Sequence, residues 1–282
     1  MSYKTYWSKA FLRKLFVILV ALHFATPLFA QFDFLVMTGS GAAMGGVSVA
    51  MPDEQSAVTG IAGLATIEKR MVALSVRQGF GIEGMGYAGS DISWPLSFGG
   101  VGASLLHYGN SDYNEQRITM AYALPMGESV SFGVAFHYLH SGTSDSYYDP
   151  LNRFTFSAAL RYAPDEQLQV AFRAYNPVAV IGENDRSVRV PALFNMGFSY
   201  QLLDGLLTVA EVEKNLYYPT SLRIGLQYRL MELYAFRLGV STHPIVYTFG
   251  CGIEMEHLGL DMAFQMHNTL GMTSLLAMHY SF

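Results

Sequence analysis

The sequence is poor in cysteine and in charge. Cys251 is its one cysteine, which excludes a disulfide framework and also lipid attachment at a cysteine of a processed N-terminus. Charged residues are 14% of the chain, whereas an ordinary soluble domain has about 25%. The formal net charge of −5 argues against nucleic acid as a partner. The length of 282 residues fits one large domain or two small ones.

Long apolar runs are also missing. After residue 30 no stretch reaches the roughly 18 consecutive apolar residues of a membrane helix, although hydrophobic residues make up 51% of the chain. An alternating pattern reconciles the two facts, because every second residue of a strand can face lipid while its neighbours face a polar lumen.

Residues 1–30 have the pattern of an export signal. Four basic residues precede the apolar stretch 15–25, and "PLFAQ" offers a cleavage site after Ala30. A membrane anchor helix is the alternative, but the apolar run is short and ends at Pro27. The pattern predicts a mature chain that begins near Gln31 and is exported to the outer membrane of a Gram-negative bacterium.

From Lys69 onward, apolar and polar residues alternate. In segment 221–230, Leu222 and Ile224 lie on one face, while Ser221 and Arg223 lie on the other. A helix would scatter the arginines through the apolar face, so we interpret such segments as half-buried strands. The predicted strands are 69–78, 85–96, 99–109, 115–124, 129–140, 152–162, 167–176, 191–202, 206–216, 220–230, 233–242, 246–256, 258–267 and 271–282. Segment 206–216 fits least well, since Glu211 and Glu213 break its pattern, and we expect a bulge there.

This layout predicts an all-β fold, a transmembrane antiparallel β-barrel of about 14 strands over residues 68–282. The two longest links, 141–152 and 176–189, follow the fifth and seventh strands, so both fall on one rim. The links after even-numbered strands are short. A soluble β-sandwich is the alternative, but the length of the strands, the arginines on the face that would be its surface and the export signal argue against it.

Residues 31–67 do not alternate and are rich in Gly, Ala and Ser. The stretch "GSGAAMGG" is close to a glycine-rich phosphate loop, but it has no Lys-Ser/Thr and no buried strand before it. We therefore expect a small-residue hatch, or plug, that folds into a mouth of the barrel.

The hatch segment resembles a family. FadL-like outer-membrane barrels of Bacteroidota, especially the PorV/PorQ branch, carry a Gly-Ala…Met-Gly…Gly…Val-Ala pattern, an acidic pair, and a later Ala-Gly-Leu-Ala. The matching hatch motif here comprises Gly41, Ala42, Met44, Gly45, Gly46, Asp53, Glu54, Ala62, Gly63 and Leu64. The family's Arg after Gly-Ala is missing, and Gly60-Ile61 replaces its Asn-Pro.

The resemblance implies a fourteen-stranded barrel with a periplasmic hatch. For the PorV/PorQ branch it implies an accessory of type IX protein secretion or cell-surface assembly, whose partners are other secretion-system barrels or lipoproteins. For FadL proper it implies the alternative, a channel for small hydrophobic molecules. Outer-membrane lipid and the outer-membrane assembly machinery are the further expected partners.

Strand parity places a set of charged residues in the lumen. They could form a path for an anionic group, or they could pair with carboxylates and hatch carbonyl groups, because an unpaired buried charge is costly. The set is Arg77, Asp91, Arg117, Arg153, Arg161, Arg173, Arg223, Arg229, Arg237, Glu254 and Asp261.

The sequence predicts no catalytic, cofactor or metal site. His137 and His140 are three apart, so on a strand they point to opposite faces. No Ser/His/Asp set is marked by its spacing, and the order of such residues along a chain does not define a triad. We therefore expect a protein that is not an enzyme.

The stretch "TSLLAMHYSF" (273–282) alternates to its last residue. It fits the closing strand of the barrel, and the aromatic residues Tyr280 and Phe282 resemble the signal that outer-membrane assembly machinery reads. We expect deletion of Phe282, or Phe282→Asp, to lower the amount of heat-modifiable barrel in the outer membrane. An unchanged amount would contradict this.

Overall fold

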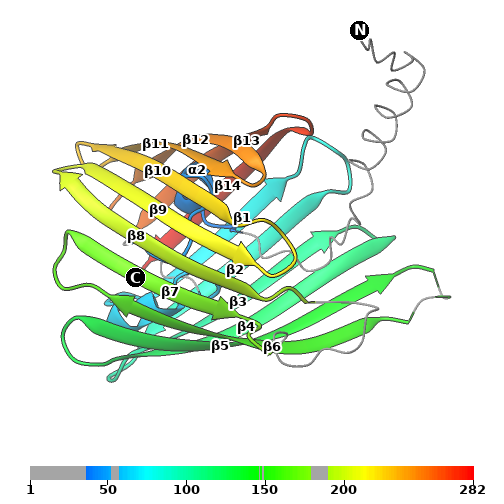
Figure 1. Ribbon diagram of the computed structural model, residues 1–282, viewed down its shortest axis with the longest axis horizontal. Coiled ribbons are helices and arrows are strands. Elements are labelled where there is room, and N and C mark those ends of the chain that lie inside the picture. The colour runs from blue at the N-terminus through cyan, green and yellow to red at the C-terminus, as the bar shows by residue number, and fades with distance from the viewer. Residues whose placement is uncertain (1–35, 52–56, 146, 148, 179–189) are drawn as a thin grey trace, which may run out of the picture. The chain divides into compact units, whose positions relative to one another are not determined.

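The computed structural model describes residues 36–51, 57–145, 147, 149–178 and 190–282. Over these residues, fourteen antiparallel strands form one closed barrel (Figure 1). The strands are β1 (Met71–Gln78), β2 (Gly86–Pro95), β3 (Gly100–Gly109), β4 (Tyr113–Pro125), β5 (Val130–Thr143), β6 (Leu151–Tyr162), β7 (Leu168–Tyr175), β8 (Leu193–Leu203), β9 (Leu206–Asn215), β10 (Ser221–Leu230), β11 (Tyr234–Thr242), β12 (Ile245–Glu254), β13 (Leu258–His267) and β14 (Gly271–Ser281). The predicted barrel is confirmed.

Side chains alternate between the two faces of the wall. On β4, Arg117, Thr119 and Ala121 are buried, whereas Ile118 and Met120 are 40% and 67% exposed on the outside. The same alternation leaves at least one large apolar side chain exposed on each of the fourteen strands. A continuous apolar outer face of this kind is typical of a wall that contacts lipid.

The described part of the chain contains no helix that is both long and apolar enough to cross a membrane.

The connections form two different rims. Links that follow odd-numbered strands, including 144–150 and 176–192, make a rim that we call the long-loop rim. Links that follow even-numbered strands make the short-turn rim, where the longest link is 163–167. The predicted parity of the long and short links therefore agrees with the structure.

The barrel closes between its first and last strands. β1 pairs with β14 along its whole length, from Met71 opposite Ser281 to Gln78 opposite Ser274. Beyond the strands, the backbones of Arg70 and Phe282 exchange two hydrogen bonds of 3.2 and 3.0 Å. This pairing closes the ring of strands.

The bulge that we predicted within 206–216 is wrong. β9 keeps a regular register at Glu211 and Glu213 with both of its neighbours. The irregularity lies in β8 instead, between Gln201 and Leu203. The two glutamates fit the alternation because they point into the lumen, where polar partners surround them.

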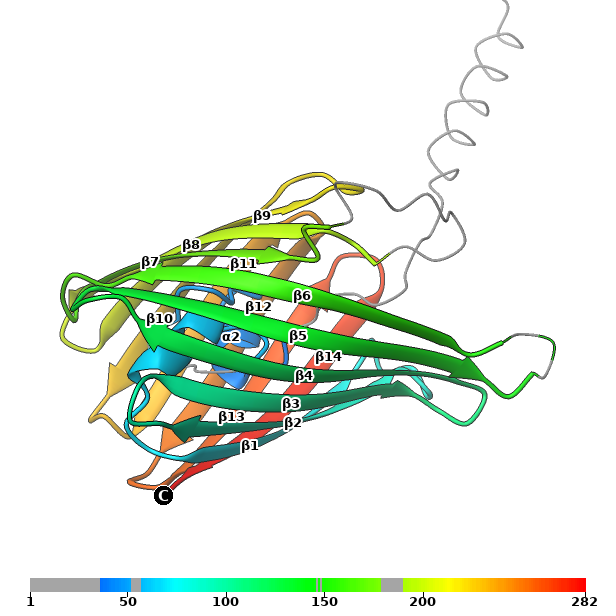
Figure 2. The same cartoon turned by 90° about the horizontal axis from the view of Figure 1, so that it is seen from below.

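The N-terminal segment lies inside the barrel as two lobes. The first hatch lobe, residues 36–51, contains the helix α2 (Gly39–Ala43), which lies against β11–β14. The second hatch lobe, residues 57–67, contains the 3-10 helix η1 (Ile61–Thr66), which lies against β2–β6. In Figure 2 α2 is seen within the ring of strands. Because these segments consist mainly of small residues, they depend on the wall for their burial.

Glycines on the lumen face of the wall make room for both lobes. A side chain at Gly239 would collide with the backbone of Met44 and Gly45. Near the second lobe, a side chain at Gly100 would collide with the carbonyl oxygen of Leu64. The hatch backbone therefore approaches the strands more closely than a wall with side chains at these positions would allow.

We expect Gly239→Ala to destabilise the folded barrel by about 1–3 kcal/mol. The added methyl group would collide with hatch backbone atoms of Met44 and Gly45, and overpacking of this kind is destabilising. Gly86→Ala is the matched control, since its methyl group would meet only the end of the Gln78 side chain, at 3.6 Å. Thermal unfolding of the purified proteins in detergent measures the difference. Equal losses in both variants would contradict the close fit of the hatch.

Candidate functional site in the lumen

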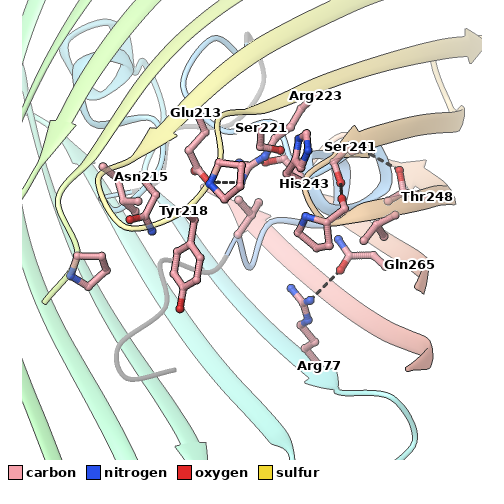
Figure 3. Close-up of a pocket in the computed structure, with 18 residues that line it drawn as sticks. Arg77, Glu213, Asn215, Tyr218, Ser221, Arg223, Ser241, His243, Thr248 and Gln265 are labelled. Carbon is pink, nitrogen blue, oxygen red and sulfur yellow. Dashed lines mark hydrogen bonds and ion pairs between the residues drawn. The ribbon is translucent and has the colours of Figure 1, made fainter. Parts of the chain in front are cut away.

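A cavity of about 590 Å³ lies between the first hatch lobe and the long-loop rim (Figure 3). We call it the long-loop cavity. On the hatch side it is bounded by Val36, Gly45 and Gly46, and on the rim side by residues of the links, among them Tyr218 and His243. The cavity is therefore bounded by the hatch on one side and by the long-loop end of the barrel on the other.

The lining of this cavity is partly apolar and partly charged. Leu193 from β8 and Val246 from β12 supply apolar surface. Arg77 from β1 donates a hydrogen bond of 2.7 Å to Gln265 on β13, as Figure 3 shows. Arg223 projects from β10 into the same space. Such a lining suits a molecule that has an apolar body and a polar end.

Arg223 joins the wall of the cavity to the hatch. Its guanidinium donates to the carbonyl oxygen of Gly46 at 2.7 Å, and it forms ion pairs with Glu213 at 2.6 Å and Glu211 at 3.3 Å. Gly45 and Gly46 have φ angles of 77° and 80°, a conformation that favours glycine. The turn that they form can therefore present its carbonyl group to the arginine.

Glu211 is the main polar anchor of the first hatch lobe. It is 2% exposed and accepts hydrogen bonds from the backbone N–H groups of Ser48 at 2.6 Å and Val49 at 3.0 Å. The Ser48 hydroxyl, Asn195 and Arg223 also donate to it. A buried carboxylate with this many donors is well compensated for its loss of water.

Arg173 ties both lobes to the wall. It is fully buried and donates to the carbonyl oxygens of Val58 and Thr59 at 3.2 and 3.4 Å, and to the Ser48 hydroxyl at 3.4 Å. It also donates to Asn195 on β8, at 2.9 Å. A guanidinium has several donors in a fixed plane, which allows it to reach two hatch segments and a strand at once.

A second cavity, of about 390 Å³, lies between the first hatch lobe and the short-turn rim. We call it the short-turn cavity. The hatch residues that bound it are Met37, Thr38, Gly39 and Ser40. Its walls carry a concentration of ionisable side chains, namely Asp91, Arg229, Arg237, Glu254, Asp261 and His279.

Two pairs of these side chains reach across an intervening strand. Arg237 on β11 forms an ion pair with Asp261 on β13, above Gly252 of β12. The carboxylate of Glu254 on β12 lies 3.0 Å from the ring of His279 on β14. A side chain at Gly252 would occupy the space of the first pair, so the glycine permits this contact.

Comparison with known proteins identifies the fold. No family model matches the chain, and no curated protein matches it. Among solved structures, it is similar to a FadL homologue from Pseudomonas aeruginosa, with 13% identity, a TM-score of 0.65, and coverage of 88% of this chain and 98% of that one. It is similar to the toluene transporter TbuX of Ralstonia pickettii, with 12% identity, a TM-score of 0.66, and coverage of 89% and 100%. The toluene transporter TodX of Pseudomonas putida gives 12% identity, a TM-score of 0.62, and coverage of 89% and 98%.

The fold is FadL-like. At these identities the likeness concerns the course of the chain, a closed fourteen-strand barrel of the outer-membrane type.

Within this FadL-like fold, the predicted lumen residues are distributed over several places. Arg77 and Arg223 reach the long-loop cavity, and Asp91, Arg229, Arg237, Glu254 and Asp261 reach the short-turn cavity. Arg117 is buried near Val58 and Thr59 of the second lobe, and Arg173 is buried between the two lobes. Arg161 donates to Gln169 and to Thr66 of η1, and Arg153 is half-buried on β6. Their joint role as a charged path stays a prediction.

The sequence prediction missed Glu211, Glu213 and Asn195. All three point into the lumen, the glutamates from β9 and Asn195 from β8, and Glu211 accepts hydrogen bonds from two backbone N–H groups of the hatch. Strand parity was the available signal, because counting in twos from Leu207 reaches both glutamates.

The hatch motif lies where the two lobes meet the wall. Gly41 and Ala42 are buried in α2, and Met44 is fully buried beside Gly225. In the second lobe, Ala62, Gly63 and Leu64 lie within η1. Asp53 and Glu54 lie outside the described residues, as does the predicted signal segment 1–30. Tyr280 and Phe282 face outward and are 48% and 51% exposed.

His137 and His140 point to opposite faces of β5. His137 is buried between the hydroxyl groups of Thr119 and Ser157, each at 2.8 Å, while His140 is near Asn152 on the outside. In the described parts of the chain, no group of three or more His, Cys, Asp or Glu residues could hold a metal ion.

We expect Glu211→Gln to destabilise the hatch by about 3 kcal/mol or more. The NH2 group of the glutamine would face hydrogen-bond donors where a carboxylate oxygen now accepts, and Arg223 would lose a buried ion-pair partner. Hydrogen exchange of residues 44–51, with thermal unfolding in detergent, measures the loss. Glu213→Gln is the matched control, since that side chain is 15% exposed and its recorded partners, Arg223 and Asn195, both belong to the wall. Equal exchange in the two variants would contradict the anchoring role of Glu211.

Proposed function

We propose that this protein is an outer-membrane channel for small hydrophobic or amphipathic molecules. Its FadL-like fold supports the outer-membrane location, as does the apolar outer face of the barrel. Two of the similar structures are described as toluene transporters. The export signal predicted from the sequence agrees with this location.

The long-loop cavity is the observation that carries the proposal. Its volume of about 590 Å³ falls in the range of small-molecule sites, roughly 300–1,000 Å³. It combines apolar surface from Leu193 and Val246 with the guanidinium groups of Arg77 and Arg223. A molecule that enters from the long-loop rim can bury an apolar body there and place a polar end near an arginine.

The finer prediction, a PorV/PorQ-like accessory of type IX secretion or surface assembly, rests on the resemblance in sequence, mainly that of the hatch motif. That reading requires other barrels or lipoproteins as stable partners. Gentle detergent extraction followed by affinity purification tests it. Recovery of such partners in fixed proportion would favour the accessory role, and recovery of the barrel by itself would count against it.

Uptake by cells tests the channel. We expect a strain that lacks its own hydrocarbon channels to take up radiolabelled toluene or octanoate faster when it expresses this protein. Uptake of a purely hydrophilic sugar should not change. The proposal fails if a folded barrel is present in the outer membrane and neither toluene nor octanoate enters these cells faster than it enters cells with an empty vector.

A bulky side chain in the long-loop cavity should slow this uptake. We expect Val246→Trp to lower it by about tenfold, which corresponds to the loss of about 1.4 kcal/mol of favourable binding. The matched control is Tyr247→Trp, because the next residue of β12 is 54% exposed on the outer face. Comparable uptake in the two variants would show that the cavity is not on the route.

A further inference from the structure

A third cavity, of about 480 Å³, lies in the outer face of the barrel and not in its lumen. Ten of its thirteen lining residues point outward, from β13, β14, β1, β2 and β3. The other three, Arg77, Tyr87 and Leu275, each lie between two outward-facing lining residues of the same strand, so their backbone forms part of the floor. We call this cavity the outer groove.

Strand pairing arranges the outward-facing residues in two rows across the five strands. The first row consists of Met262, Leu276, Val76, Ala88 and His107, each opposite the next. The second row lies nearer the long-loop rim and consists of Phe264, Ser274, Gln78, Gly86 and Gly109. Five strands span four spacings of about 4.8 Å, so the groove is about 19 Å long. It crosses the seam between β14 and β1, where the barrel closes.

Small residues make this part of the outer face hollow. Gly86, Ala88 and Gly109 form the middle and one end of the floor. One row nearer the short-turn rim, Leu74 and Leu105 are large side chains with 50% and 46% exposure, and they form a wall. A hydrocarbon chain in the groove would contact protein on its sides as well as below, which increases its dispersion contacts over those on a flat wall.

The first row continues beyond the groove in both directions and changes in polarity. On β4, β5 and β6 it continues from His107 with the polar residues Gln116, His140 and Asn152. From Met262 toward β9 it continues with Cys251, Phe236, Tyr228 and Leu206. The row is therefore apolar as far as Ala88 and polar from His107 onward.

The polar end of the row lies at the long-loop rim. Leu206 begins β9 beside the short turn 204–205, whereas Asn152 is near the start of β6, beside the long link 144–150. Strands of membrane barrels are tilted by about 35–45°, so a row that crosses them climbs from one rim to the other. His107 and Gln116 thus lie nearer the membrane surface than Val76 and Leu276 do.

We propose that the outer groove binds one membrane lipid of the leaflet on the long-loop side. The acyl chain lies over Leu276, Val76 and Ala88, and oxygen atoms of the headgroup accept hydrogen bonds from His107 and Gln116. The apolar-to-polar order of the row matches the chain-to-headgroup order of such a lipid. A flexible chain can follow the floor of a hollow, whereas the wall of a second barrel is itself convex. The site is independent of the proposed channel function.

The bound lipid stabilises the closure of the barrel. Its chain crosses β14 and β1, the pair that joins the two ends of the sheet. A ligand that binds the folded protein but not the unfolded chain raises the stability as its concentration increases. Removal of the lipid should therefore lower the temperature at which the barrel unfolds.

Native mass spectrometry of the purified protein with 1-palmitoyl-2-oleoyl-phosphatidylethanolamine tests the site. We expect one lipid to be retained, and Ala88→Trp to lower the retained fraction about tenfold, because the indole fills the middle of the groove. The matched control is Ala103→Trp, since Ala103 is also exposed on the outer face but does not line the groove. Equal losses in the two variants, or no preference for a single lipid, would overturn the proposal.

The polar end of the site has its own test. We expect the double variant His107→Leu, Gln116→Leu to retain about tenfold less lipid, because both hydrogen-bond donors are lost. Thr208→Leu removes a polar side chain from the outer face of β9, away from the groove, and should have no effect. A heat-modifiable band shows that each variant is folded. Full retention of lipid by the folded double variant would contradict the proposal.

A phosphatidylethanolamine with a photoreactive diazirine in its acyl chain locates the lipid. Labelling concentrated in residues 74–88 and 262–278 is expected, and even labelling around the barrel would mean bulk lipid only. Dimers that cover the groove and retain no lipid would assign it to a second copy of the chain. Added lipid should raise the unfolding temperature of the native protein and of Ala103→Trp, but not of Ala88→Trp. An equal rise in all three would also overturn the proposal.

Discussion

The structure depends on one constraint, which is that a wall in contact with hydrocarbon must satisfy its backbone hydrogen bonds internally. Pairing of β1 with β14 meets it, because the last edge disappears when Met71 lies opposite Ser281. The outer face can then be almost wholly apolar, as Phe136 and Phe154 show with 68% and 82% exposure. Most polar side chains of the strands therefore face the lumen.

That lumen has to be filled, and the hatch fills it by hydrogen bonding as well as by packing. Glu211 and Arg173 are buried charges, and each contacts hatch backbone groups directly. A buried charge without such partners would be strongly destabilising. The hatch and the charged lumen therefore stabilise each other, and the lumen-facing glycines let the two approach within bonding distance.

The two hatch lobes are held to the wall by different kinds of contact. Apolar packing of Ile61 and Leu64 fixes one side of the barrel, while polar contacts from Thr248 and Arg223 hold the other side beside two cavities. Similar structures at 11–13% identity share the course of the chain. With so few identical residues, the likeness describes the fold, and any function has to be argued from the side chains of this chain's own lumen.

The alternation of apolar and polar residues by itself determined the barrel, its strand number and the parity of its links, because the period of two is a local property that needs no partner. It also placed Arg223 and Arg237 in the lumen. The alternation did not reveal that Glu211 anchors Ser48, or that Gly239 accommodates Met44, since these residues are far apart in sequence. Only the tertiary structure decided which charges meet, where the cavities lie and which lobe separates them, because those contacts are set by how the hatch docks against the closed wall.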